Sequence, residues 1–424
     1  MRFPLLTLFA MMGFSHAHAE LIIQGETTTI KPAPVTNSTY QPTKNFQSCL
    51  AGLRSSAIAA GVSATTYDRY TQNLAPDYSV IDKLNYQPEF STDIWDYLSG
   101  LVDNERVQDG QQKLTQHSGV LSRVEAAYNV PRETVVAVWG VESNFGNISG
   151  KYPLIQALGT LSCEGRRQAF FRTEFFTTLK ILQRGDLTED QLKGSWAGAF
   201  GHTQFMPTTY DRLAVDFDGD GRRDLVSSVP DALASTANFL KRAGWQSGMP
   251  WGFEVQVPSS TSLAGEGRRN KKALNTWVSR GVTRMDGSPL IQGNLSANTP
   301  AGLLAPAGIN GPKFLVFKNF DAIYGYNAAE SYALAIALLS DRLQGKPGII
   351  ASWGTDDPGT SRAERREIQT LLLQRGHDIG EADGLIGDKS RQAIKIEQQR
   401  LGFATTGRAG QKILTALRAE QLMQ

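Results

Sequence analysis

The chain has few of the side chains that hold zinc in proteins. Its 424 residues include two cysteines and five histidines, and no group of these shows a short ligand spacing. Zinc sites draw three or four such ligands from closely spaced motifs or from a compact histidine and carboxylate set. The small number and wide spacing of the cysteines and histidines therefore argue against a zinc-dependent hydrolase.

An excess of charge and a long hydrophobic run are also absent. Lys and Arg number 43 against 41 Asp and Glu, which leaves a net charge of +2. So small an excess excludes strong field-driven attraction to nucleic acid. Beyond the N-terminus no stretch approaches the ~20 uninterrupted apolar residues of a transmembrane helix. The ordinary share of hydrophobic residues, 41%, fits a globular protein of two or three domains.

The N-terminus has the pattern of a secretory signal peptide. Arg2 precedes a short apolar run, 5–14, and Ala17-His18-Ala19 has the small residues of a cleavage site. We therefore expect residues 1–19 to be removed on export, with a buried N-terminal helix as the alternative. Because no cysteine precedes Cys49, lipid attachment at the cleavage point is not expected.

The two cysteines can form only one intramolecular bridge. An exported protein folds where disulfides persist, so we expect a bond between Cys49 and Cys163. The alternative is a pair of buried thiols.

Apolar periodicity divides the rest of the chain. Residues 20–45 are rich in Thr, Pro, Asn and Gln and are expected to form a flexible leader. Residues 46–345 are mostly helical in pattern and form the expected main domain. Two strand-like runs, 253–257 and 313–317, predict a small β-rich subdomain within it.

A segment dense in Gly, Pro and Asp, 346–361, is the expected linker to a small C-terminal domain, 362–424. The fold class is therefore mainly α, with a small β-rich part and a three-helix C-terminal domain. The expected helices of this last domain are Arg365–Gln374, Asp388–Leu401 and Gly410–Gln421.

One carboxylate stands out on a predicted helix that follows Pro131. Val135, Val138, Trp139 and Glu142 fall at i, i+3, i+4 and i+7, on one face. Burial without a cation raises the pKa of a carboxyl group, and a protonated acid can protonate a glycosidic oxygen. The alternative is a glutamate at the helix end that points to solvent.

Two further segments offer groups suited to a saccharide. Residues 195–207 are rich in small residues and contain Gln204, whose amide can donate and accept, beside Phe205. Tyr326-Asn327, with Tyr332, supplies aromatic faces and a second amide. An ordinary glycine-rich turn and a buried tyrosine pair are the respective alternatives.

An aspartate-rich loop matches the front of a calcium-binding loop. Aspartates occupy positions 1, 3, 5 and 9 from Asp216, and glycine occupies position 6. Position 12 is Ser227, so a strong ligand is missing and a weak Ca²⁺ or Na⁺ site is expected. Residues 228–231 also read as a helix capping box. The candidate ligands are Asp216, Asp218, Asp220, Arg222 and Asp231.

These motifs together resemble the B-type lytic murein transglycosylases. Residues 138–146, residues 204–207, the aspartate-rich loop and Tyr326-Asn327 occur in the order of that family, over about 46–343. The resemblance implies a lysozyme-like α+β catalytic domain in which Glu142 is the sole acid/base. The residues that it places in the glycan cleft are Ser195, Gln204, Phe205, Arg166, Arg167, Tyr326, Asn327 and Tyr332. Residues 383–388, with Ala393-Ile394, resemble a peptidoglycan-binding domain.

The implied reaction cleaves the MurNAc-GlcNAc β-1,4 bond of peptidoglycan without water and leaves 1,6-anhydro ends. It requires no cofactor and is expected in the periplasm, with peptidoglycan strands as substrate and cell-wall synthesis or divisome proteins as possible partners. Two alternatives stay open. One is a hydrolytic muramidase with a second carboxylate, for which Glu164 is the nearest candidate; the other is a non-catalytic protein that binds cell-wall glycan.

Overall fold

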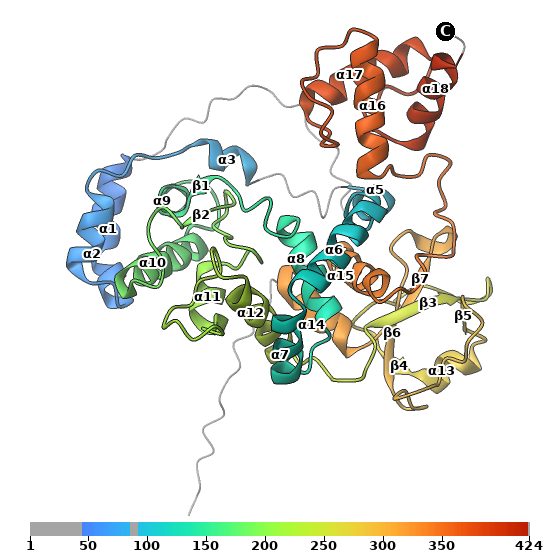
Figure 1. Ribbon diagram of the computed structural model, residues 1–424, viewed down its shortest axis with the longest axis horizontal. Helices are drawn as coiled ribbons and strands as arrows, with labels where there is room; N and C mark the ends of the chain where they lie inside the picture. The colour runs from blue at the N-terminus through green and yellow to red at the C-terminus, as the bar shows by residue number, and fades with distance from the viewer. Residues whose placement is uncertain (1–44, 85–91, 423–424) are drawn as a thin grey trace, which may run out of the picture. The chain divides into compact units, whose positions relative to one another are not determined.

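The computed structural model describes residues 45–84 and 92–422 of the chain. The expected signal peptide, 1–19, and nearly all of the expected leader, 20–45, lie outside these residues, so both stay predictions. Within the described residues helices dominate (Figure 1), and none of them is long and apolar enough to cross a membrane.

A first helical cluster has its own hydrophobic core, built largely of leucine and phenylalanine. Its helices α9 and α10 pack closely on one another, and the two-stranded pair β1–β2 lies beside α9. A disulfide between Cys49 and Cys163, 114 residues apart, joins α1 to the last residue of α9. The elements are α1 (Phe46–Ala59), α2 (Ala64–Thr71), α3 (Ser79–Lys83), β1 (Tyr152–Pro153), α9 (Leu154–Cys163), α10 (Gln168–Arg184), β2 (Lys193–Gly194) and α11 (Pro207–Leu213).

A second helical cluster surrounds α8. Every residue of α8 from Thr134 to Gly140 is buried, because the helix is apolar on all sides and packs against α15, α6, α7 and α12. The elements are α5 (Ile94–Leu101), α6 (Asn104–Gln116), α7 (Ser118–Tyr128), α8 (Arg132–Ser143), α12 (Val229–Arg242), α14 (Lys318–Asn327) and α15 (Glu330–Leu343).

The β-rich part is a five-stranded antiparallel sheet in the order β4-β6-β7-β3-β5. The two strand-like runs of the sequence form β3 (Gly252–Gln256) and β7 (Lys313–Val316). The sequence did not predict β6 (Pro300–Leu304). Four of its five residues are buried, so the strand lacks the alternation of apolar and polar residues that marks a half-exposed strand. The remaining elements are β4 (Lys272–Ala273), α13 (Leu274–Ser279) and β5 (Thr283–Arg284).

The C-terminal residues form three helices around a small core of their own (Figure 1). They are α16 (Arg362–Gln374), α17 (Asp388–Arg400) and α18 (Gln411–Gln421), close to the predicted ranges. Ser361 and Glu364 form a reciprocal capping box that starts α16 three residues earlier than expected. The predicted fold class, mainly α with a small sheet and a three-helix C-terminal part, is confirmed.

The disulfide is expected to carry much of the stability of the first cluster. In the chain-entropy account, a bridge that closes a loop of this length stabilises the native state by roughly 4–5 kcal/mol. Urea unfolding should show a loss of about this size after reduction. The double variant Cys49→Ala/Cys163→Ala should show it without reductant and then be insensitive to dithiothreitol, whereas equal stability with and without the bridge would refute this account.

Candidate active site

Glu142 lies in the last turn of α8, at the point where this buried helix reaches a partly exposed surface. The helix ends because Asn144 adopts a left-handed conformation, with φ of 49°. Gly146 follows with φ of 85°, and a Cβ on it would lie 2.3 Å from Nδ1 of His202. Only glycine fits there, so the chain after Glu142 can turn tightly against the segment around His202.

Two tyrosines from neighbouring helices face the Glu142 carboxylate. The hydroxyl of Tyr332, on α15, donates a hydrogen bond to Oε1 of Glu142. Tyr326, on α14, stacks on Tyr332 with ring centroids 6.3 Å apart and donates to the carbonyl of Thr203 at 2.7 Å. Burial, and then the negative charge of Glu142, raise the pKa of both tyrosines well above the ordinary value. Both hydroxyls therefore stay protonated and act as donors.

The segment that contains Gln204 and Phe205 lies next to these tyrosines. Phe205 is buried and its ring contacts Tyr326 edge-on, with centroids 5.8 Å apart. Gln204 has φ of 50°, and its amide nitrogen donates to the carbonyls of Ser149 and Gly201. Phe239 and Tyr326 pack against the cores of both helical clusters. The residues around Glu142 thus gather where the two clusters meet.

The sequence did not single out a polar network that joins α8 to this segment. Ser143 donates to the carbonyl of His202 and accepts from the amide of Gly146 at 2.8 Å. The indole of Trp139 donates to Nδ1 of His202 at 3.2 Å. Burial lowers the pKa of His202, which keeps the ring neutral and Nδ1 an acceptor. In the sequence, only the position of His202 within the segment 195–207 could have indicated that it belongs to this network.

The other predicted cleft residues make contacts of their own. The Ser195 hydroxyl accepts from the amide of Ala199 at 3.0 Å and so holds a turn, and Asn327 is exposed at the last residue of α14. Arg166 donates to the carbonyl of Leu84, and the Arg167 guanidinium lies over the ring of Phe170. The structure thus brings Glu142, Tyr332, Tyr326 and Phe205 together, and the roles of all the predicted site residues stay predictions.

Three of the predicted cation ligands form a cluster. Carboxylate oxygens of Asp216, Asp218 and Asp231 lie within 4.8 Å of one another. Asp231 is fully buried at the start of α12 and accepts from three backbone amides, those of residues 217, 218 and 224. Burial raises its pKa despite these bonds, and Asp218 adds to the rise. Asp220 is not part of the cluster, and its carboxylate accepts from the amide of Arg222.

The family models match two segments. Residues 45–341 match the Transglycosylase SLT domain, and residues 361–417 match a family of peptidoglycan binding domains. A curated relative, membrane-bound lytic murein transglycosylase B of Escherichia coli, is 32% identical over 244 residues. That match spans 57% of this chain and 64% of the relative, which is less than two thirds of its length.

Solved structures are similar over a larger part of the chain. SltB3 from Pseudomonas aeruginosa, in complex with NAG-anhNAM-pentapeptide, is 44% identical with a TM-score of 0.71, over 88% of this chain and all of that one. The lytic transglycosylase Slt35 of Escherichia coli, in complex with calcium, is 28% identical with a TM-score of 0.60, over 70% of this chain and 92% of that one. With its family model matched from residue 45 to 341, the chain belongs to the Transglycosylase SLT domain family.

Proposed function

We propose that the protein is a lytic transglycosylase that cleaves the MurNAc-GlcNAc β-1,4 bond of peptidoglycan and leaves 1,6-anhydro-MurNAc ends. The observation that carries this proposal is the partly buried Glu142 carboxylate, which accepts a hydrogen bond from Tyr332 where the two helical clusters meet. The SltB3 complex with NAG-anhNAM-pentapeptide supports it, because that ligand contains an anhydro muramic sugar.

In the proposed reaction Glu142 acts first as an acid and then as a base. It protonates the glycosidic oxygen as the bond to C1 of the muramic sugar breaks. The carboxylate then takes the proton of the C6 hydroxyl while that oxygen bonds to C1, which closes the anhydro ring and regenerates the acid. No water is consumed. The proton transfers are assigned to the carboxyl group of Glu142, which the hydrogen bond from Tyr332 to Oε1 orients.

The remaining predicted residues are assigned to substrate binding. Gln204, Ser195 and Asn327 are proposed to face the sugars, and the buried Phe205 is proposed to support the cleft by packing against Tyr326. Arg166 and Arg167 are proposed to pair with stem-peptide carboxylates, because both side chains are exposed and guanidinium groups bind carboxylates in a bidentate manner. The match of residues 361–417 supports a second contact with the wall through the C-terminal domain.

The proposed place of action is the periplasm, where peptidoglycan is accessible. The disulfide between α1 and α9 supports an oxidising compartment. A cleaved, non-lipidated leader and partners from cell-wall synthesis or the divisome stay predictions.

The first test is the replacement of the proposed acid/base. Glu142→Gln should lower turnover of purified peptidoglycan by roughly 10²–10⁴-fold, because the amide cannot transfer the proton. Glu133→Gln, in the first turn of the same helix, is the matched control and should be active. Mass spectrometry of the wild-type digest should show products one water lighter than hydrolysed ones. Hydrolysed products would favour a muramidase, and full activity of Glu142→Gln would favour a binding protein.

The second test addresses the tyrosine that contacts the acid/base. Tyr332→Phe removes one hydrogen bond to a charged group, which is expected to lower kcat by about 10- to 100-fold at nearly unchanged KM. Tyr324→Phe, on the adjacent helix α14, keeps its ring and loses a hydroxyl elsewhere, and should retain kcat. Unchanged turnover in Tyr332→Phe would remove this tyrosine from the mechanism.

We further assign the cluster of Asp216, Asp218 and Asp231 to a structural calcium ion. Three carboxylates this close repel one another, and a hard divalent cation with oxygen ligands offsets that repulsion. In this assignment Asp231 supplies the carboxylate ligand that is missing at position 12 of the loop, where the sequence has Ser227. The complex of Slt35 with calcium supports the choice of ion.

Calcium should therefore stabilise the native state. At a free concentration a hundred times the dissociation constant, the expected gain is about 2.7 kcal/mol, visible as a higher Tm. Asp231→Asn should abolish the response, whereas Asp190→Asn, which removes a fully exposed charge, should keep it. A Tm that does not change with calcium in the wild type would contradict the assignment.

A further inference from the structure

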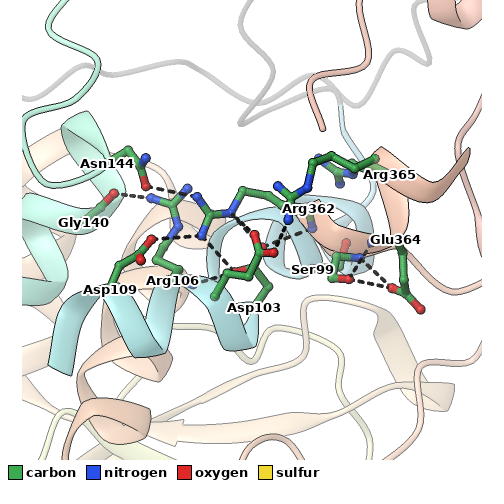
Figure 2. Close-up of polar contacts among 12 residues, drawn as sticks. Ser99, Asp103, Arg106, Asp109, Gly140, Asn144, Arg362, Glu364 and Arg365 are labelled. Carbon is green, nitrogen blue, oxygen red and sulfur yellow. Dashed lines mark hydrogen bonds and ion pairs between the residues drawn. The ribbon is translucent and has the colours of Figure 1, made fainter. Parts of the chain in front are cut away.

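The first residue of α16 contacts two helices of the second helical cluster (Figure 2). The backbone amide and Nε of Arg362 donate to Oδ2 of Asp103, at 3.1 and 3.0 Å. Its Nη1 donates to Oδ1 of Asn144 at 3.2 Å. The Asp103 side chain is 2% exposed and that of Arg362 15%, so this pair is shielded from solvent.

A second arginine lies beside the first. Arg106 is buried on α6, one turn after Asp103, which caps that helix by accepting from the Arg106 amide at 2.8 Å. Its guanidinium donates to the carbonyl of Gly140 on α8. Burial, and then the positive charge of Arg362, lower the pKa of Arg106 to about 10, so it stays charged at neutral pH. Figure 2 shows both guanidiniums between Asp103 and Asp109.

The two arginines contact backbone or side-chain groups of α8 and its C-cap at positions that flank Glu142 in the sequence. Arg106 contacts Gly140, two residues before Glu142, and Arg362 contacts Asn144, two residues after it. Asn144 is the residue whose left-handed conformation ends the helix. The hydrogen bond from Arg362 to Asn144 therefore restrains the orientation of the last turn of α8, which carries Glu142.

The rest of this contact is also ionic. Arg366 of α16 pairs with Glu105 of α6, and Arg408 pairs with Asp96 of α5. The backbone approaches closely as well, since a Cβ on Gly359 would lie 2.5 Å from the carbonyl oxygen of Trp95. Arg366 and Arg408 therefore hold the C-terminal domain through α5 and α6, whereas Arg362 also reaches α8.

From these contacts we infer that Arg362 is a positioning residue for Glu142, supplied by the C-terminal domain to the end of the catalytic helix. The inference rests on the proposed function. Through Arg362 the C-terminal domain would then raise the turnover rate of the enzyme, in addition to binding the cell wall. Loss of Arg362 leaves Asp103 buried without its cation and frees the side chain of Asn144, which loosens the last turn of α8.

The test separates positioning from simple attachment of the domain. Arg362→Gln should lower kcat on a short soluble glycan by about tenfold, with KM within twofold, because misplaced catalytic groups slow the chemical step. Arg362→Lys should recover part of kcat through its charge. Arg366→Gln is the matched control, since it breaks an ion pair of the same helix that does not reach α8, and it should keep kcat.

Hydrogen exchange gives a readout that does not need activity. The amides of residues 140–146 should exchange faster in Arg362→Gln than in the wild type or in Arg366→Gln. Equal exchange and equal kcat in the two variants would overturn the inference, as would a loss confined to binding of insoluble wall. If the wild type made no anhydro products, the proposed function would fail, whereas the exchange result would still decide whether Arg362 orders α8.

Discussion

A carboxylate at the end of a buried helix is the constraint around which the site is organised. α8 is buried from Thr134 to Gly140, and Glu142 reaches a partly exposed surface in the last turn, one residue before the helix ends at Ser143. The end needs a left-handed Asn144 and a Gly146 that leaves room for His202. The protonated hydroxyl of Tyr332, on α15, then donates to the carboxylate and replaces part of the solvation that burial removes, while Tyr326, on α14, stacks on Tyr332.

The position of the site follows from the way in which two separate cores meet. α8 and α15 belong to the second helical cluster, whereas Phe205 belongs to the core of the first. Tyr326 packs against both and bonds to the backbone of Thr203. The junction of the two clusters combines apolar side chains with a few directed polar groups, a combination that is common in ligand-binding clefts.

Charged contacts tie the C-terminal helices to α8, the helix that carries Glu142. Arg362 and Arg106 are like charges side by side, and Asp103 and Asp109, which flank the two guanidinium groups, offset their repulsion. Two other features hold segments together elsewhere: the aspartate cluster fixes the loop before α12 to the start of that helix, and the disulfide joins α1 to α9 across 114 residues of sequence. Each is an interaction whose loss exposes an uncompensated charge or a longer unfolded loop.

Local patterns were enough for the helical class and the three C-terminal helices, because apolar spacing is visible along a single helix. The same spacing singled out Glu142, a carboxylate on an apolar face, whose role stays a prediction. Local patterns were also enough for the disulfide, since two cysteines allow one pairing. They did not find β6, whose buried run does not alternate, nor the capping box that begins α16 at Arg362. Ser143, His202 and the pair Arg362–Asp103 acquire partners 59 to 259 residues away, and such partners exist only after the chain has packed. Which hydroxyl faces Glu142, and which arginine reaches its helix, are decided by that packing, because hydrogen bonds depend on distances in space that spacing along the chain does not define.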